Sequence, residues 1–273
     1  MSDHIGKKLS PVLFLPHGGG PLPLLGDKNH ESLITFLKNI SLKLETPDVI
    51  LLVSAHWEEQ TPTLTGGDAP ALIYDYYGFP DEAYHLQYAT QGSPKLAEKI
   101  KDLCASSGII ISINQQRGYD HGMFVPLLLM YPQANIPCIQ LSLQKNLDPE
   151  FHIELGKTLS SLREQNVLVI GSGLSFHNMQ VFFSPAESSK KQSVEFDEWL
   201  TATCASDDLS FSERENRLID WEEAPSARFC HPRAEHLLPL HVCFGAACET
   251  SGKAEIVFND DILGHRASGF LWD

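Results

Sequence analysis

Short apolar runs that alternate with helical segments constrain the fold of this chain more than any other feature. Six runs rich in leucine and β-branched residues read as buried strands: Val12 to Leu15, Val49 to Val53, Ile109 to Ile113, Ile136 to Leu141, Val167 to Ile170 and Ile256 to Phe258. Helical spacing covers Ser32 to Leu44, Lys95 to Cys104 and Phe151 to Arg163. This alternation predicts an α/β fold with a central, largely parallel or mixed β-sheet flanked by helices.

The chain is long enough to bury a sizeable core. It has 273 residues, 42% of them hydrophobic, and shows no internal repeat or low-complexity tract. Its most polar region, residues 184–216, reads as a surface excursion with a short helix around Phe196 to Leu200, and not as a domain boundary. We therefore expect residues 1–273 to form a single domain.

The charge balance bears on the kind of partner. With 20 basic and 35 acidic residues the net charge is -15, which argues against nucleic acid or an anionic membrane surface and favours a small-molecule ligand. No run of 18 apolar residues and no signal peptide are readable, so a cytoplasmic location without a membrane partner is expected. The six cysteines form no CxxC pair and are expected to be buried free thiols.

Four histidines follow predicted strands. His17 lies in PHGGG after the first strand, His56 in SAHW after the second, His121 in YDHG and His177 in SFHN. Ligand sites of open α/β sheets lie beyond the carboxyl ends of the strands. A lone histidine there is more often a hydrogen-bonded loop residue, but four at one edge favour a functional site, and the neighbouring glycines allow close backbone approach.

The stretch HPRAEHLLPLH places His231, His236 and His241 at five-residue intervals. On a helix a step of five residues turns about 140°, so at most one of the three can serve a given site. Pro239 would kink such a helix, and this irregularity suits an inward-facing ligand at His236, with a core histidine as the plainer alternative. His231 and His241 are expected to be structural.

Several familiar catalytic motifs are absent. There is no HExxH, and GGG at 18–20 lacks the Lys-Ser/Thr of a phosphate-binding loop. GSGLS at 171–175 is neither GxGxxG nor the GxSxG nucleophile elbow. What remains is a set of imidazoles from separate loops, the arrangement expected of a mononuclear iron or zinc site with open coordination positions.

Five motifs in order, PHGGG, SAHW, YDHG, SFHN and CHPRAEHLLPLHVCFGAA, resemble the class III extradiol ring-cleaving dioxygenases, specifically the DOPA 4,5-dioxygenase-like branch. The resemblance covers nearly the whole chain, from about Pro11 to Trp272, and makes residues 1–273 one catalytic domain. It implies a divalent metal held by His17, His56 and His236. It also implies that His177 is either an additional ligand or an acid-base group, and that His121 lines the substrate pocket.

The resemblance also implies the reaction. A catechol such as DOPA would be opened beside its diol with dioxygen, Fe(II) would be needed for activity, and Zn(II) could be bound in the purified protein. His177 would accept a catechol proton with help from His121. The protocatechuate-type branch uses a glutamate as third ligand, but Glu235 would point about 100° away from His236 on a helix, so the imidazole is favoured.

Two alternatives use the same residues. A zinc hydrolase would activate water at the histidines, and a non-enzymatic binding protein would need only the fold. Several aromatic residues could either form a wall of the pocket or belong to ordinary core packing: Trp57, Tyr74, Tyr76, Tyr77 and Phe79. Arg233 could meet a substrate carboxylate, although a surface salt bridge is the plainer reading.

Overall fold

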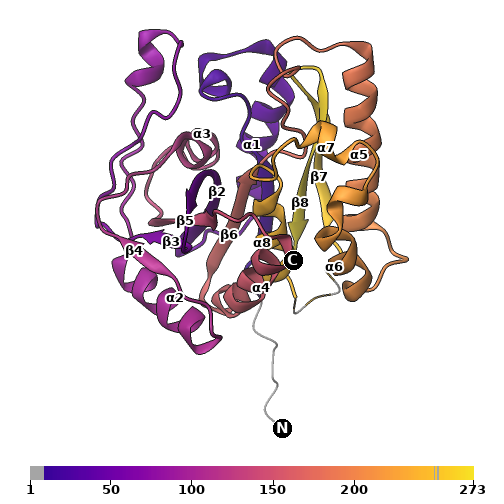
Figure 1. Ribbon diagram of the computed structural model, residues 1–273. Coiled ribbons are helices and arrows are strands. Elements are labelled where there is room, and N and C mark those ends of the chain that lie inside the picture. Colours follow the sequence, from indigo (N-terminus) through magenta and orange to yellow (C-terminus); the bar gives the residue numbers. More distant parts are fainter. Residues whose placement is uncertain (1–8, 249, 251) are drawn as a thin grey trace.

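A computed structural model describes residues 9–248, 250 and 252–273 and shows one central sheet with helices on both faces (Figure 1). The sheet has eight strands in the order β4-β3-β5-β2-β6-β1-β8-β7. The strands are β1 (Val12–Pro16), β2 (Val49–Glu59), β3 (Thr63–Thr65), β4 (Ser112–Asn114), β5 (Cys138–Gln144), β6 (Val167–Gly173), β7 (Glu255–Ile262) and β8 (His265–Trp272).

Eight α-helices and five short 3-10 helices are found in the described part of the chain. The α-helices are α1 (Glu31–Lys43), α2 (Pro94–Ser106), α3 (His121–Met130), α4 (Pro149–Leu159), α5 (Glu187–Ala205), α6 (Phe211–Ile219), α7 (Ala227–Cys230) and α8 (Leu238–Ala246). The 3-10 helices are η1 (Leu22–Leu25), η2 (Lys28–His30), η3 (Asp81–Tyr84), η4 (Ser160–Gln165) and η5 (Trp221–Glu223). No described helix has the length and apolar character needed to cross a membrane.

The sheet is mixed. β1, β6, β2 and β5 are parallel neighbours, whereas β8 runs antiparallel to both β1 and β7 and β3 runs antiparallel to β5. All residues of β1 and β6 are buried, which explains why these strands appear as continuous apolar runs in the sequence. The α/β fold with a largely parallel or mixed sheet is confirmed.

β6 shows how closely the two faces of the sheet are covered. A Cβ atom at Gly173 would lie 2.1 Å from the carbonyl oxygen of His236, and one at Gly171 would lie 2.5 Å from that of Pro239. Ser172, between them, points to the other face and donates its hydroxyl to the carbonyl of Gly122 in α3. The glycines of GSG therefore serve close packing of the chain around α8, and this brings His236 against the end of β6.

Two predicted strands begin later than expected. Gly108 has φ +78, and the N–H of Ile109 bonds back to the carbonyl of Cys104, so the start of the run at 109–113 forms the turn that ends α2. Ile110 is accordingly 77% exposed, and β4 starts only at Ser112. β5 starts at Cys138, directly after Pro137, and β3 and β8 had no counterpart among the predicted strands.

The structure corrects the prediction for the polar region at 184–216. It contains α5, a helix of 19 residues that packs against β8, and not a surface excursion with a short helix. Phe196 and Leu200 are fully buried on its inner face. Asp197 is buried beside them and accepts hydrogen bonds from Ser268 at 2.9 Å and Asn259 at 2.7 Å. The polar composition misleads because the buried face of this helix also carries polar residues, among them Ser189, Ser193 and Asp197.

The cysteines carry no disulfide. All six are free, and Cys104, Cys138, Cys204, Cys230 and Cys243 are buried, as expected from the sequence. Cys248 is free and half-buried.

Candidate metal centre

Five imidazoles gather where the central parallel strands end. His17 directly follows β1, His56 lies in β2, His177 comes shortly after β6, His121 begins α3 and His236 lies just before α8. All five line one cavity of about 310 Å³. The structure therefore brings together every histidine that the sequence singled out for a site.

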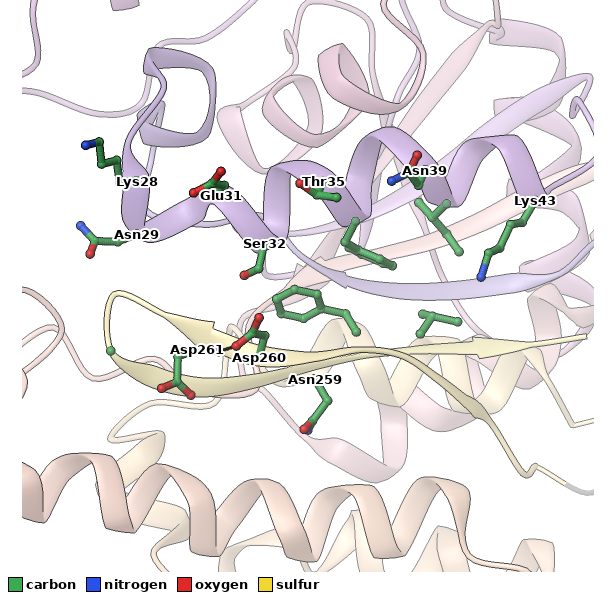
Figure 2. Close-up of a pocket in the computed structure, with 15 residues that line it drawn as sticks. Lys28, Asn29, Glu31, Ser32, Thr35, Asn39, Lys43, Asn259, Asp260 and Asp261 are labelled. Atoms are coloured by element: carbon green, nitrogen blue, oxygen red, sulfur yellow. Dashed lines mark hydrogen bonds between the residues drawn. The ribbon is translucent and has the colours of Figure 1, made fainter.

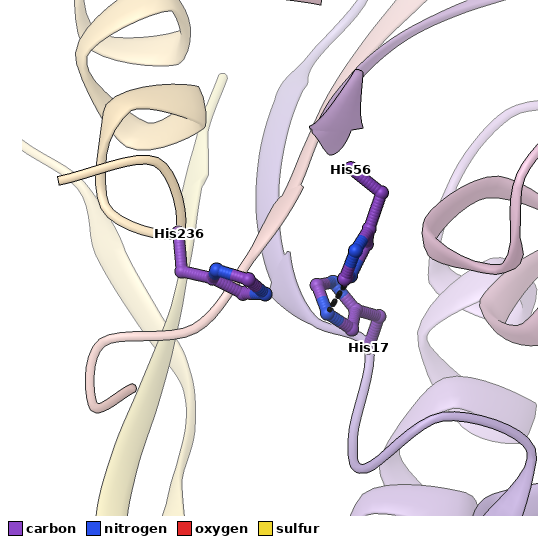
Figure 3. A group of neighbouring side chains, drawn as sticks. All are labelled: His17, His56 and His236. Atoms are coloured by element: carbon purple, nitrogen blue, oxygen red, sulfur yellow. Dashed lines mark hydrogen bonds between the residues drawn. The ribbon is translucent and has the colours of Figure 1, made fainter. Parts of the chain in front are cut away.

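Three of these rings face one another, as Figure 3 shows for His17, His56 and His236. The Nε2 atoms of His17 and His56 are 3.0 Å apart, and one nitrogen from each of the three rings lies within 4.8 Å of the others. Two nitrogen ligands at about 2.1 Å from one ion and about 90° apart are themselves about 3.0 Å apart. The spacing of the three rings therefore fits a shared divalent ion.

The outer nitrogens of two of these rings are hydrogen-bonded to the protein. Ser172 donates its hydroxyl to the carbonyl of Gly122, so its Oγ accepts from Nδ1 of His17, at 3.1 Å. Glu235 accepts in the same way from Nδ1 of His236, at 2.9 Å. A proton fixed on Nδ1 leaves the lone pair of Nε2 free to face the centre, as in metal-bound histidine.

Two carboxylates stand behind the histidines. Oε1 of Glu235 lies 3.2 Å from Nδ1 of His177 in addition to its contact with His236. Oδ1 of Asp75 accepts from both the backbone N–H and Nδ1 of His121, at 2.9 and 2.8 Å, while its Oδ2 is 3.8 Å from Nδ1 of His56. These histidine–carboxylate contacts make up the two other groups with metal-ligand spacing, so the all-imidazole group is the better candidate for the ion.

The protonation of the site suits a metal. Burial, followed by the neighbouring imidazoles, lowers the pKa of His17, His56 and His236 well below the ordinary value of histidine. Burial raises the pKa of Glu235 and of Asp75, but hydrogen bonds from His177 and His121 outweigh it and leave both pKa values lowered. At neutral pH the three rings are neutral, which is the form that binds metal, and both carboxylates are ionised.

The PHGGG loop places His17. Gly18 has φ +84, and a Cβ atom there would lie 2.7 Å from the Pro23 ring and 2.9 Å from His30. The N–H of Gly19 donates to Nε2 of His30 at 3.0 Å. The glycines thus turn the chain sharply at the end of β1 and let it pack on His30, a structural task unrelated to phosphate binding.

His236 is not part of a kinked helix. It lies in the turn before α8, and Pro239 occupies the first turn of that helix, where a missing N–H costs nothing. The expected kink at Pro239 is wrong for this reason. His231 and His241 are fully buried and hydrogen-bonded to the carbonyls of Ser175 and Leu218, as expected of structural histidines.

The aromatic lining matches the prediction in part. Tyr76, Tyr77 and Phe79 line the cavity. Trp57 does not, and its Nε1 donates to Glu59; Tyr74 does not either, and its hydroxyl donates to the Leu86 carbonyl. Residues that line the cavity without having been anticipated are Asp75, Leu174, Met179, Phe182 and Phe183. The last three follow SFHN closely, and that proximity was the available signal.

Arg233 forms a salt bridge and does not line the cavity. Its guanidinium contacts both carboxylate oxygens of Glu58 and approaches Oε2 of Glu235 at 3.4 Å, with about half of its side chain exposed. This agrees with the salt-bridge reading and not with a contact to a substrate carboxylate.

A larger groove lies elsewhere, between α1 and β7 (Figure 2). It measures about 880 Å³, and its rim carries Lys28, Glu31, Asn39, Asp260 and Asp261. None of the groups with metal-ligand spacing found among the described residues lies there. The smaller histidine cavity is therefore the candidate site.

Comparison with known proteins finds similarity over nearly the whole chain. The family described as the catalytic LigB subunit of aromatic ring-opening dioxygenase matches residues 11–269. A solved structure of an uncharacterized protein, JW3007, from Escherichia coli K12 has a TM-score of 0.76 and 25% sequence identity, and the match covers 97% of this chain and 100% of that one.

Three curated relatives cover most of both chains. The dioxygenase tasH of Hapsidospora irregularis is 37% identical over 97% of this chain and 86% of its own length. A 4,5-DOPA dioxygenase extradiol of Beta vulgaris is 37% identical over 92% and 91%, and one of Escherichia coli K12 is 30% identical over 86% and 84%. The chain therefore belongs to the class III extradiol dioxygenases, the family of the LigB catalytic subunit, and is an aromatic ring-opening dioxygenase.

Proposed function

We propose that residues 1–273 form one catalytic domain that opens a catechol beside its diol, using dioxygen and Fe(II). The observation that carries this proposal is the meeting of His17, His56 and His236 at the base of a cavity that two further imidazoles line. The relatives named 4,5-DOPA dioxygenase extradiol support DOPA or a related aromatic diol as the substrate.

His17, His56 and His236 would hold the ion through their inner nitrogens. When bound, a ferrous ion supplies a centre that brings the diol and dioxygen together and lets electrons pass from the diol to dioxygen. Three neutral imidazoles add no negative charge to the site, so a deprotonated diol is favoured there. The same donor set also accepts Zn(II). Because such sites bind Zn(II) more tightly than Fe(II), the purified protein could carry zinc.

His177 would take a proton from the diol. It lines the cavity, its ring lies 3.3 Å from that of His236 and nearly parallel to it, and its Nδ1 is engaged by Glu235. Nε2 is therefore the atom available to the substrate. His121, which also lines the cavity and whose Nδ1 contacts Asp75, would assist by hydrogen bonding to the substrate.

Metal and oxygen dependence test this function against hydrolysis at the same histidines. Protein freed of metal is loaded anaerobically with Fe(II) or Zn(II) and offered DOPA, other catechols, and a panel of esters and amides, with dioxygen uptake, hydrolysis and product absorbance followed. Uptake and a coloured ring-opened product are expected with Fe(II) alone. A zinc-loaded protein that hydrolyses esters or amides, together with an iron-loaded protein that consumes no dioxygen with any catechol, would contradict the proposal.

A further inference from the structure

The cavity changes character from its base to its mouth. At the base, His17, His121 and His236 are almost completely buried. At the mouth, Tyr77 is 92% exposed, and Met179 and Phe183 are each 56% exposed, although all three line the cavity. A catechol whose diol lies against the histidines must direct the substituent on the opposite side of its ring toward this aromatic and thioether mouth.

No cationic side chain lines this cavity, whose lining lies wholly within the described residues. The nearby Arg233 lies outside the lining and is engaged by Glu58 and Glu235. The Nδ1 atoms of His121 and His177 each contact a carboxylate of the protein, Asp75 and Glu235 respectively. Asp75 also lines the cavity, and its side chain is 24% exposed.

We propose that this site selects catechols whose ring substituent has no net charge, as in zwitterionic DOPA, or is cationic, and that it discriminates against substituents with a net negative charge. The inference rests on the proposed cleavage of catechols. A carboxylate at the mouth would find no cationic partner in the lining, and Asp75 would repel it. An ammonium group there meets aromatic faces and the field of Asp75, both of which attract it.

A matched series isolates the charge. Three catechols carry at C4 the same two-carbon tail and differ only at its end: 4-ethylcatechol ends in hydrogen, dopamine in an ammonium group and 3-(3,4-dihydroxyphenyl)propionate in a carboxylate. Their dissociation constants are measured anaerobically on the Fe(II)-loaded protein from the absorbance of the bound catecholate. Values of kcat/KM are then measured with dioxygen.

Dopamine is expected to bind at least as tightly as 4-ethylcatechol, and the propionate about tenfold more weakly, with the same order in kcat/KM. Binding of the propionate as tight as that of 4-ethylcatechol, or tighter, would overturn the inference. It would leave ring cleavage intact, whereas failure of all three compounds to bind and to be opened would instead refute the proposed function.

A gain of function locates the discrimination at the mouth. Met179→Lys places a cation there, and Met179→Gln is the uncharged control of similar size. The lysine variant is expected to reduce the discrimination against the propionate about tenfold, while the glutamine variant keeps it. Because Met179 is more than half exposed, both variants should fold, which thermal melting checks. If the two variants discriminate equally against the propionate, the residues at the mouth do not determine the selectivity for charge.

Discussion

The two carboxylates behind the histidines anchor the two halves of the site differently. In the Glu235 half, formed by Glu235, His177 and His236, one carboxylate oxygen lies 3.2 and 2.9 Å from the outer nitrogens of the two rings. In the Asp75 half, formed by Asp75, His56 and His121, the carboxylate is 2.8 Å from His121 but 3.8 Å from His56. Only the Glu235 half ties its metal-facing ring to its acid-base ring through one atom.

The difference follows from where the two metal-facing rings lie in the chain. His56 lies within β2, and its backbone N–H donates to Oγ of Ser54, whose hydroxyl donates to buried Asp120. His236 lies in a turn before α8, where its carbonyl accepts from the N–H of Leu174 and the adjoining Glu235 accepts from Nδ1 of its ring. The backbones of both residues are therefore anchored, but only the ring of His236 has a carboxylate within hydrogen-bond distance of its outer nitrogen.

The largest expected effect is loss of metal, and it should be the same for the metal-facing histidine of either half. His56→Ala and His236→Ala each remove one bond to the ion, so both variants should lose most of their metal. Metal content after anaerobic loading, measured by elemental analysis on protein of verified fold, checks this. His85→Ala, which changes an exposed histidine outside the cavity, is the control and should keep its metal. Full metal content in both site variants would remove the assignment of ligands.

The next effect separates proton transfer from metal binding. His177→Ala should retain metal while kcat falls by about 10²- to 10⁴-fold, as for loss of a general base, and His121→Ala should lose less. Turnover is expressed per bound iron. If His177→Ala loses metal as completely as His236→Ala does, His177 is a fourth ligand, and an unchanged kcat would deny it any role.

The comparison between the halves is tested most sharply by removing each carboxylate charge. Glu235→Gln should weaken metal binding by about 10- to 100-fold, because the orientation of His236 depends on it. Asp75→Asn should change metal affinity only by a few-fold, since its distance to His56 is too long for a hydrogen bond. Affinities come from competition with a chromophoric chelator. A larger effect of Asp75→Asn would reverse the proposed difference.

The smallest effect concerns the outer contact of the Glu235 half. Arg233→Met removes a half-exposed guanidinium that reaches Glu235 at 3.4 Å. Exposed ion pairs contribute about 0–1 kcal/mol, so metal affinity should fall by less than about fivefold. The same chelator competition measures it. A loss as large as that of Glu235→Gln would mean that the arginine, and not the turn itself, fixes the carboxylate.

Much of the fold and the histidine set could be predicted because both are local signals. Continuous apolar runs mark strands buried on both faces, and His17 and His56 lie at or just after such runs. β8 was not predicted because Ser268 and Gly269 interrupt its apolar pattern, although both are buried in the sheet. α5 was mistaken for a surface excursion because its buried face includes polar residues such as Ser189, Ser193 and Asp197.

The carboxylates behind the rings could not be predicted. Asp75 lies 46 residues from His121 in sequence, and nothing in a single chain reveals that pairing. Glu235 adjoins His236, and its identity suggested a competing ligand until the structure placed its oxygen on the outer nitrogen of the ring. Contacts of this kind depend on the tertiary fold, so residue type and spacing do not report them.

The most direct test of the proposed chemistry at this site is the fate of labelled dioxygen. Fe(II)-loaded protein and its His236→Ala variant are given ¹⁸O₂ with 4-ethylcatechol or DOPA, and the product is analysed by mass spectrometry immediately after a single turnover. Both label atoms are expected in a ring-opened product, formed by the unchanged protein alone. A product without label, or labelled product formed equally by the variant, would contradict ring opening at the three-histidine centre.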